Sequence, residues 1–337
     1  MTVPVRAYAA TSPGRPLEIL NYELGDLHPD EVRIEVSHSG LCRSDLDALD
    51  DRLGTSSYPL VAGHEIIGQV SAVGSSVTHL RVGQRVGVGP ICNTCLNCEY
   101  CASGRDNVCS KVEFTIGGGR RGGFADIVHV PAAYAFPIPD SLGSENAAPL
   151  LCAGITSYAP ISRHTTSESH VGVIGIGGLG HLALKFAAAR GSEVTAISTS
   201  PRKADAARRF GAHNFVASSD AEQLRRAAGS LDFILSTVDA DLNWLDYLNL
   251  LRPDGKICFV GASMGPIGVP AAMLIMGQYS LVGSAAGSRA TTTEMLEFSA
   301  RHQIWAETEV VPMSDINRAI ERMRSGDAPF RFVLTHE

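Results

Sequence analysis

Five cysteines stand within one short stretch of the chain, ICNTCLNCEYCASGRDNVC at residues 91–109. Four of them, Cys95, Cys98, Cys101 and Cys109, follow the pattern C-x2-C-x2-C-x7-C. The short gaps let neighbouring thiolates converge on one ion, and the longer gap lets a loop close around it. This spacing predicts a structural zinc site with four thiolate ligands, which leaves no open coordination position for chemistry.

An iron–sulfur cluster is the alternative for this stretch, because Cys92 precedes Cys95 at the same spacing. A ferredoxin run needs three residues before its last cysteine and a proline after it. Here two residues precede Cys101, and Ala102 follows it. The pattern therefore favours zinc, and Cys92 is expected to be a packing residue.

A glycine-rich segment, VGVIGIGGLGH at residues 171–181, stands between a strand-like run and a helix-like run. Glycines in the order G-x-G-x-x-G allow a tight turn and let a pyrophosphate approach backbone N–H groups at the start of a helix. The segment therefore predicts a dinucleotide-binding loop. Its residues are Gly175, Ile176, Gly177, Gly178, Leu179 and Gly180.

The second strand of this domain ends in TAISTSPRK, and no acidic residue follows before Asp205. An acid about twenty residues after the glycines would bind the 2′-hydroxyl of NAD. This segment offers hydroxyl groups and positive charge instead, which suits the 2′-phosphate of NADP. Alternatively, its two basic residues begin a solvated helix. The candidate contacts are Ser198, Thr199, Ser200, Arg202 and Lys203.

The elements that must position these residues fall into two groups. Short strands with glycine-rich turns fill the chain to about residue 150, and strands alternate with helices from Gly172 onward. Six strands with crossover helices predict a doubly wound parallel sheet, the Rossmann arrangement. With 337 residues the chain is long enough for two domains. We expect one at 1–152 and 289–337, and a dinucleotide-binding domain at 153–288.

Composition excludes several other classes of protein. Hydrophobic residues make up 45% of the chain and charged residues 19%, with a net charge of −7 and scattered basic residues. Neither nucleic acid nor a membrane surface is therefore an expected partner. The first residues lack the apolar core of a signal peptide, so a cytoplasmic location is expected. Clustered cysteines in such a reducing compartment more often bind metal than form disulfides.

Three further stretches complete a longer pattern: GLCRSDLD at 40–47, GHE at 63–65 with its following glycines, and PLLCAGITSY at 149–158. Together with the cysteine run, GIGGLGH and STSPRK, they resemble the zinc-dependent medium-chain alcohol dehydrogenases nearly end to end. The similarity is greatest to the cinnamyl alcohol dehydrogenase branch. This resemblance implies a mostly β, GroES-like catalytic domain beside the Rossmann domain.

The resemblance also implies roles for individual residues. It implies a second, catalytic zinc on Cys42, His64 and Cys152, with Glu65 beside it, either behind these ligands or as an exchangeable ligand. Asp45 would hydrogen-bond to the ligating histidine, and Ser44 would pass the proton to and from the substrate. Further cofactor contacts are implied for Arg43, Thr156, Thr237, Gly261, Gly283, Ser284, Ala285 and Arg331. Family members form homodimers, so a homodimer is expected.

The implied function is the interconversion of aldehydes and primary alcohols, aromatic, allylic or medium-chain, by hydride transfer with NADP(H). Two departures from the branch concern the proton relay and the shape of the substrate pocket. CRSDLD replaces CHSDLH, so Asp47 stands where a histidine usually ends the proton relay, and the segment between Cys109 and Cys152 is short. The alternatives are a biosynthetic reductase of an iminium or conjugated double bond on the same fold, and a non-catalytic nucleotide-binding protein.

Overall fold

The computed structural model describes residues 2–327 and 330–336. The chain forms two compact units, one of Met1–Cys152 with Gly287–Glu337 and the other of Ala153–Ala286. In the part of the chain that is described, none of the helices is long and apolar enough to cross a membrane.

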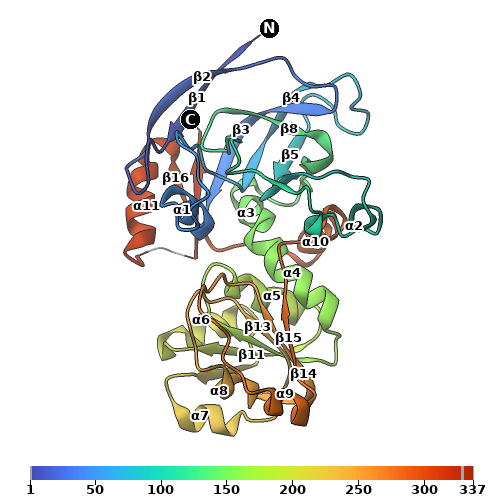
Figure 1. Ribbon diagram of the computed structural model, residues 1–337, viewed down its shortest axis with the longest axis vertical. Coiled ribbons are helices and arrows are strands. Elements are labelled where there is room, and N and C mark those ends of the chain that lie inside the picture. Colours follow the sequence, from blue (N-terminus) through green and yellow to red (C-terminus); the bar gives the residue numbers. More distant parts are fainter. Residues whose placement is uncertain (1, 328–329, 337) are drawn as a thin grey trace. The chain divides into compact units, whose positions relative to one another are not determined.

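The first unit is built mainly on a seven-stranded sheet (Figure 1). Its strand order is β16-β17-β3-β4-β5-β9, and β8 also pairs with β3. These strands are β3 (Glu31–Leu41), β4 (Ile66–Val73), β5 (Arg85–Val88), β8 (Ile127–Pro131), β9 (Phe136–Pro137), β16 (Thr308–Pro312) and β17 (Arg331–Thr335). Two hairpin-like pairs stand apart: β1 (Val3–Ala9) with β2 (Glu18–Leu24), and β6 (Ile91–Asn93) with β7 (Glu113–Phe114).

Helices of the first unit connect these strands at its periphery. They are α1 (Arg43–Leu49), α2 (Glu99–Ala102), α3 (Ser144–Ala147), α10 (Arg289–His302) and α11 (Ile316–Arg324). One buried apolar cluster lies under β1, α1 and α11, and a second fills the space between β3, β4, β5 and β8. The segment TTTEMLEFSARH lies within α10, and INRAIERMR forms α11.

The second unit is a six-stranded parallel sheet in the order β12-β11-β10-β13-β14-β15. Its strands are β10 (His170–Ile174), β11 (Glu193–Ser198), β12 (Asn214–Ala217), β13 (Leu231–Ser236), β14 (Leu251–Phe259) and β15 (Ser280–Gly283). Strands of a parallel sheet are covered on both faces, so they are nearly continuous apolar runs. All six strands predicted from the sequence are present, in the doubly wound order.

Helices cover both faces of this sheet, with α5 and α8 on opposite sides in Figure 1. The helices of the unit are α4 (Ala153–His164), α5 (Gly180–Ala189), α6 (Ala204–Arg209), α7 (Ala221–Arg226), α8 (Trp244–Leu248) and α9 (Ala271–Gly277). Because the strands are parallel, their carboxyl ends share one edge of the sheet, where doubly wound folds bind ligands.

Candidate metal centre and cofactor edge

Four potential metal ligands from distant parts of the chain meet inside the first unit. Cys42 follows β3, His64 and Glu65 precede β4, and Cys152 follows a short 3-10 turn at Ala148–Leu151. Their ligand atoms all lie within 4.8 Å of one another, and all four side chains are buried. Cys152 Sγ lies 3.9 Å from Cys42 Sγ and 3.2 Å from His64 Nε2.

Asp45 organises this set from the first turn of α1. Its Oδ1 accepts hydrogen bonds from His64 Nδ1 at 2.8 Å and from the Gly63 backbone N–H at 2.9 Å. Its Oδ2 accepts one from the Cys42 backbone N–H at 2.8 Å. A carboxylate on Nδ1 fixes the imidazole tautomer that leaves Nε2 free for a metal. The contact implied for Asp45 is therefore present.

Arg331 lies against the same set. Its Nη2 donates to Glu65 Oε1, and its Nη1 lies 3.8 Å from Cys42 Sγ. The resemblance implied a cofactor contact for Arg331, whereas here its buried guanidinium is paired with a ligand candidate. Glu65 Oε2 has no hydrogen-bond partner among the described residues. One carboxylate oxygen thus remains available to an ion.

The buried charges shift the acidity of two ligand candidates. The hydrogen bond with Cys152, and then the positive charge of Arg331, hold the pKa of Cys42 well below its usual value. This favours the thiolate, which is the form that binds metal. Burial raises the pKa of Glu65 to about 7, although Arg331 acts in the opposite direction.

The second cluster is the cysteine lobe at residues 95–109. The sulfur atoms of Cys98 and Cys101 lie 3.5 Å apart, as do those of Cys95 and Cys109. The Cys95–Cys101 and Cys98–Cys109 pairs are separated by 3.8 Å. Cys92 lies outside the cluster: its buried thiol donates to the Glu113 carbonyl oxygen at 3.5 Å, and burial raises its pKa to about 11.

Both clusters fit zinc. A tetrahedral ion with Zn–S bonds of about 2.3 Å holds its sulfur ligands roughly 3.8 Å apart. The lobe meets this value with four thiolates, so its residues close the coordination shell. The other cluster supplies two thiolates, one imidazole nitrogen and a carboxylate that is already engaged by Arg331. That donor set leaves room for an exchangeable position, as in a catalytic site.

A chain of buried hydrogen bonds ties the lobe to α10. Thr94 Oγ1 lies 3.5 Å from Cys101 Sγ and 2.7 Å from the Tyr134 hydroxyl. That hydroxyl donates to Asp106 Oδ2 at 3.0 Å. Asp106 in turn accepts from Arg289 Nε at 3.1 Å and from the Arg289 backbone N–H at 3.2 Å, at the start of α10. The carboxylate therefore satisfies one of the free backbone N–H donors at the helix N-terminus.

Ser44 and Asp47, the two residues in question for proton transfer, lie on α1. Ser44 is exposed, with its Oγ 4.0 Å from Cys42 Sγ. Asp47 is partly exposed, and its Oδ1 accepts hydrogen bonds from Arg43 Nε at 3.2 Å and Arg52 Nη1 at 3.5 Å. Arg43 and Asp47 are four residues apart on one helix face, so they meet without any long-range constraint.

The glycine-rich loop lies at the carboxyl edge of the parallel sheet. Gly175 directly follows β10 with a φ of +87°, a left-handed conformation that favours glycine. A Cβ on Gly180 would lie 1.8 Å from the Gly175 carbonyl oxygen, so the start of α5 can pack only with glycine there. Thr237 Oγ1 donates to the Ile174 and Gly175 carbonyl oxygens at 2.9 and 3.0 Å.

The other predicted cofactor residues of this unit lie mainly at strand ends. Ser198 ends β11, Gly283 ends β15 before Ser284 and Ala285, and Gly261 follows β14. Thr199, Ser200 and Arg202 form the turn after β11, and Thr156 lies on α4. Lys203 was predicted to offer its charge to the cofactor, and its Nζ donates to the Ile176 carbonyl oxygen of the glycine-rich loop at 2.9 Å.

Two residues that support the loop were missed in the sequence. His181 is buried one residue after the last glycine, with its Nδ1 3.0 Å from the Gly177 carbonyl oxygen. Ser157, on α4, donates to the Leu179 carbonyl oxygen at 3.1 Å. The histidine that follows GIGGLG was the available signal, while Ser157 carries none.

Comparison with known proteins agrees with this geometry. Residues 28–140 match the alcohol dehydrogenase GroES-like domain family, and residues 178–301 match the zinc-binding dehydrogenase family. A probable mannitol dehydrogenase of Fragaria ananassa is 41% identical over 97% of this chain and 94% of its own length. These matches confirm the predicted fold class.

Solved structures of alcohol dehydrogenases have the same fold as this chain. A cinnamyl alcohol dehydrogenase of Sorghum bicolor superposes with a TM-score of 0.95 and 38% identity, covering 99% of this chain and 98% of its own. The CAD of Helicobacter pylori, complexed with NADP(H), has a TM-score of 0.90 and 30% identity, with 99% of each chain covered. The chain is thus an oxidoreductase of the zinc-dependent medium-chain alcohol dehydrogenase family, and within that family it resembles the cinnamyl alcohol dehydrogenase branch.

Proposed function

We propose that this chain interconverts aldehydes and primary alcohols with NADP(H), at the site formed by Cys42, His64 and Cys152. The observation that carries the proposal is the buried three-ligand set whose histidine is oriented by Asp45. A zinc ion held there would act as a Lewis acid on the substrate carbonyl oxygen, and a bound NADPH would supply the hydride.

The residues of the chain would orient the metal ligands, exclude bulk water from them and supply a proton to the substrate. Asp45 keeps the imidazole of His64 in the ligating tautomer, and burial of all four ligand side chains keeps bulk water from them. The Ser44 hydroxyl can both donate and accept a hydrogen bond, so it can deliver a proton to the oxygen of the reduced substrate. Arg331 holds Glu65, which limits how that carboxylate can approach the ion.

The choice of NADP(H) rests on the turn after β11. Ser198, Thr199, Ser200 and Arg202 present hydroxyl groups and a cation where an NAD-binding domain would carry an acid. Lys203 contributes less directly, because its ammonium group supports the glycine-rich loop. The similar H. pylori structure is itself a complex with NADP(H).

Replacing Thr199 by aspartate tests this cofactor assignment. The added carboxylate would repel the 2′-phosphate, so we expect kcat/KM with NADPH to fall by about tenfold or more while kcat/KM with NADH rises. Thr199→Asn is the matched control, since it has the same size without the charge. An unmodified enzyme with equal or higher kcat/KM for NADH would contradict the assignment.

The substrate class is tested by a panel of aldehydes. We expect turnover of aromatic, allylic or medium-chain aldehydes with NADPH at a rate that depends on bound zinc. Mannitol with NADP⁺ belongs in the panel, because a relative is named for that sugar alcohol. A protein that holds zinc and NADPH but reduces no aldehyde would overturn the proposal.

We further infer a cytoplasmic homodimer. None of the eight cysteines, all of them within the described residues, forms a disulfide, which suits a reducing compartment. Strand β15 lies at an edge of its sheet, and the same unit exposes Met264, Ile267, Ile275 and Met276. An edge strand can pair with a second copy, and exposed apolar side chains favour burial in an interface. Sedimentation analysis of the purified protein measures whether it is a dimer.

A further inference from the structure

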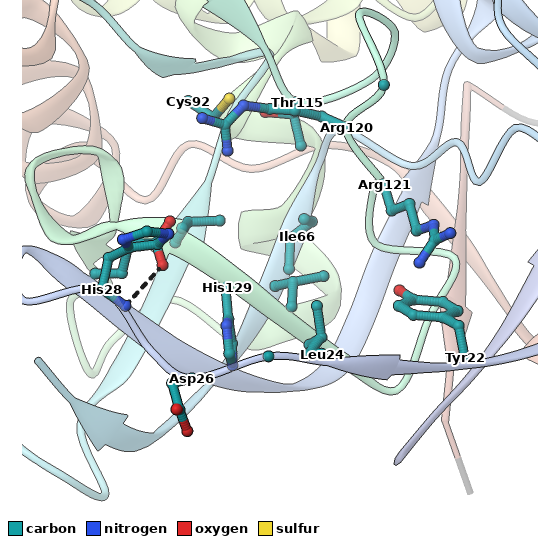
Figure 2. Close-up of a pocket in the computed structure, with 15 residues that line it drawn as sticks. Tyr22, Leu24, Asp26, His28, Ile66, Cys92, Thr115, Arg120, Arg121 and His129 are labelled. Atoms are coloured by element: carbon teal, nitrogen blue, oxygen red, sulfur yellow. Dashed lines mark hydrogen bonds between the residues drawn. The ribbon is translucent and has the colours of Figure 1, made fainter. Parts of the chain in front are cut away.

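The first unit contains a cavity that is separate from the two clusters of metal-ligand candidates. Among the described residues, none of the eight candidate ligands lines it. It has a volume of about 350 Å³. β2, β8 and the loop at 115–121 form most of its wall (Figure 2). This volume falls at the lower end of the range of small-molecule sites.

The floor of the cavity is apolar. Leu24, Ile66, Cys92, Val128 and Val130 line it, and four of these side chains, all but Leu24, are buried. Figure 2 shows Ile66 and Leu24 between the two ends of the cavity. Of these five side chains, Leu24 alone keeps substantial accessible surface, so a bound molecule would place its apolar body over Leu24, where contact removes apolar surface from water.

One end of the cavity carries an available cation. Arg121 lies over the ring of Tyr22, with its guanidinium carbon 3.9 Å from the ring centroid. Within residues 2–327 and 330–336, no carboxylate forms an ion pair with Arg121. Arg120, its neighbour, differs: its Nε and Nη2 donate to Glu113 Oε2 at 2.8 and 2.5 Å. Arg121 is thus the guanidinium that a ligand could engage, in bidentate fashion.

The other end of the cavity is acidic. Glu31 Oε2 accepts a hydrogen bond from the His28 backbone N–H at 3.2 Å, and Asp26 also lines the cavity (Figure 2). His129 adds no positive charge near neutral pH, since burial and the neighbouring Arg33 lower its pKa. The cavity is therefore positive at Arg121 and negative at Glu31, with apolar side chains between.

We propose that this cavity is a second ligand site that takes a small monocarboxylate with an apolar body, such as an aromatic acid. The carboxylate would bind Arg121, and the body would lie over Leu24. The acidic end sets the orientation and rejects a second negative charge, because like charges at close range repel. The proposal is independent of the alcohol dehydrogenase activity.

Benzoate titrated into the zinc-loaded enzyme tests the proposal. The readout is the ¹⁵N NMR signal of Arg121 Nε, assigned by its absence in Arg121→Gln, so that benzoate at the catalytic metal is not mistaken for binding here. We expect a saturable shift with a Kd in the millimolar range. Neutral benzamide should leave the signal unmoved, and terephthalate should bind more weakly than benzoate.

Calorimetry on variants completes the test. Arg121→Gln should weaken the benzoate affinity of this site about tenfold or more, because a charge-assisted contact is lost. Arg121→Lys should retain part of it. Arg120→Gln is the matched control and should change the affinity less than about threefold, since that guanidinium already serves Glu113. An Arg121 signal that stays unmoved by benzoate, or equal shifts with benzoate and benzamide, would overturn the proposal.

Discussion

Cys152→Ser is expected to leave a folded protein whose kcat is lower by more than about a hundredfold. Loss of a residue that only orients a ligand already costs about 10–100-fold, and Cys152 would be a ligand itself. A serine hydroxyl is a harder and less acidic donor than a thiolate, so it holds zinc poorly. The measurements are kcat for an aldehyde, zinc content by mass spectrometry, and the thermal midpoint Tm. Cys92→Ser is the matched control, because this buried thiol lies outside both clusters and donates only to a carbonyl oxygen.

Cys109→Ser should show the opposite balance between stability and chemistry. A closed four-thiolate site contributes its binding free energy to folding, so Tm should fall and the lobe should lose its zinc. The hydrogen bonds of Asp106 to Tyr134 and Arg289 should also weaken, because the position of this buried carboxylate depends on the arrangement of the lobe. A single zinc ion per chain in fresh, fully active enzyme would show that the two clusters do not have these separate roles.

Ser44→Ala is expected to lower kcat by roughly 10²–10⁴, which is the usual contribution of a positioned proton donor. The removed hydroxyl is the group beside Cys42 that can hand a proton to the substrate oxygen while receiving another. Asp47→Asn should lower kcat by less than about threefold, because it removes only partly exposed ion pairs with Arg43 and Arg52.

The profile of kcat against pH separates the two residues. Ser44→Thr keeps the hydroxyl and should recover much of the activity that Ser44→Ala loses, whereas a purely structural role of Ser44 would not be rescued in this way. If Asp47→Asn were as slow as Ser44→Ala, the carboxylate would belong to the proton path. The explanation of Asp47 as the partner of two arginines would then be wrong.

Sequence reasoning predicted best those features that depend on residues close together in the chain. The alternation of apolar runs from Gly172 predicted all six parallel strands, because each strand is buried on both faces and each crossover is a helix. The cysteine lobe is equally local, since its ligands lie within fifteen residues. The proximity of Cys42 and Cys152 could not be predicted from their spacing in the sequence. It was predicted from the resemblance to known dehydrogenases.

Two pairings were beyond sequence reasoning. Arg331 meets Glu65 because β17 pairs with β3 in a register that sets Phe332 opposite Leu41, and no pattern in the sequence specifies that register. Lys203 has two chemically reasonable partners, a phosphate group or a nearby carbonyl oxygen. Composition cannot choose between them, because the choice depends on how the glycine-rich loop approaches α6.

The late position of β17 in the chain has a consequence for how the protein is made. Synthesis adds about 5–20 residues per second, so Arg331 follows Cys109 by roughly 10–40 s. The cysteine lobe is contiguous and can take its zinc as soon as it leaves the ribosome. The sheet around Cys42 still lacks β17 at that time, and Glu65 still lacks its guanidinium partner. We therefore expect the cysteine lobe to bind its zinc before β17 completes the sheet around Cys42.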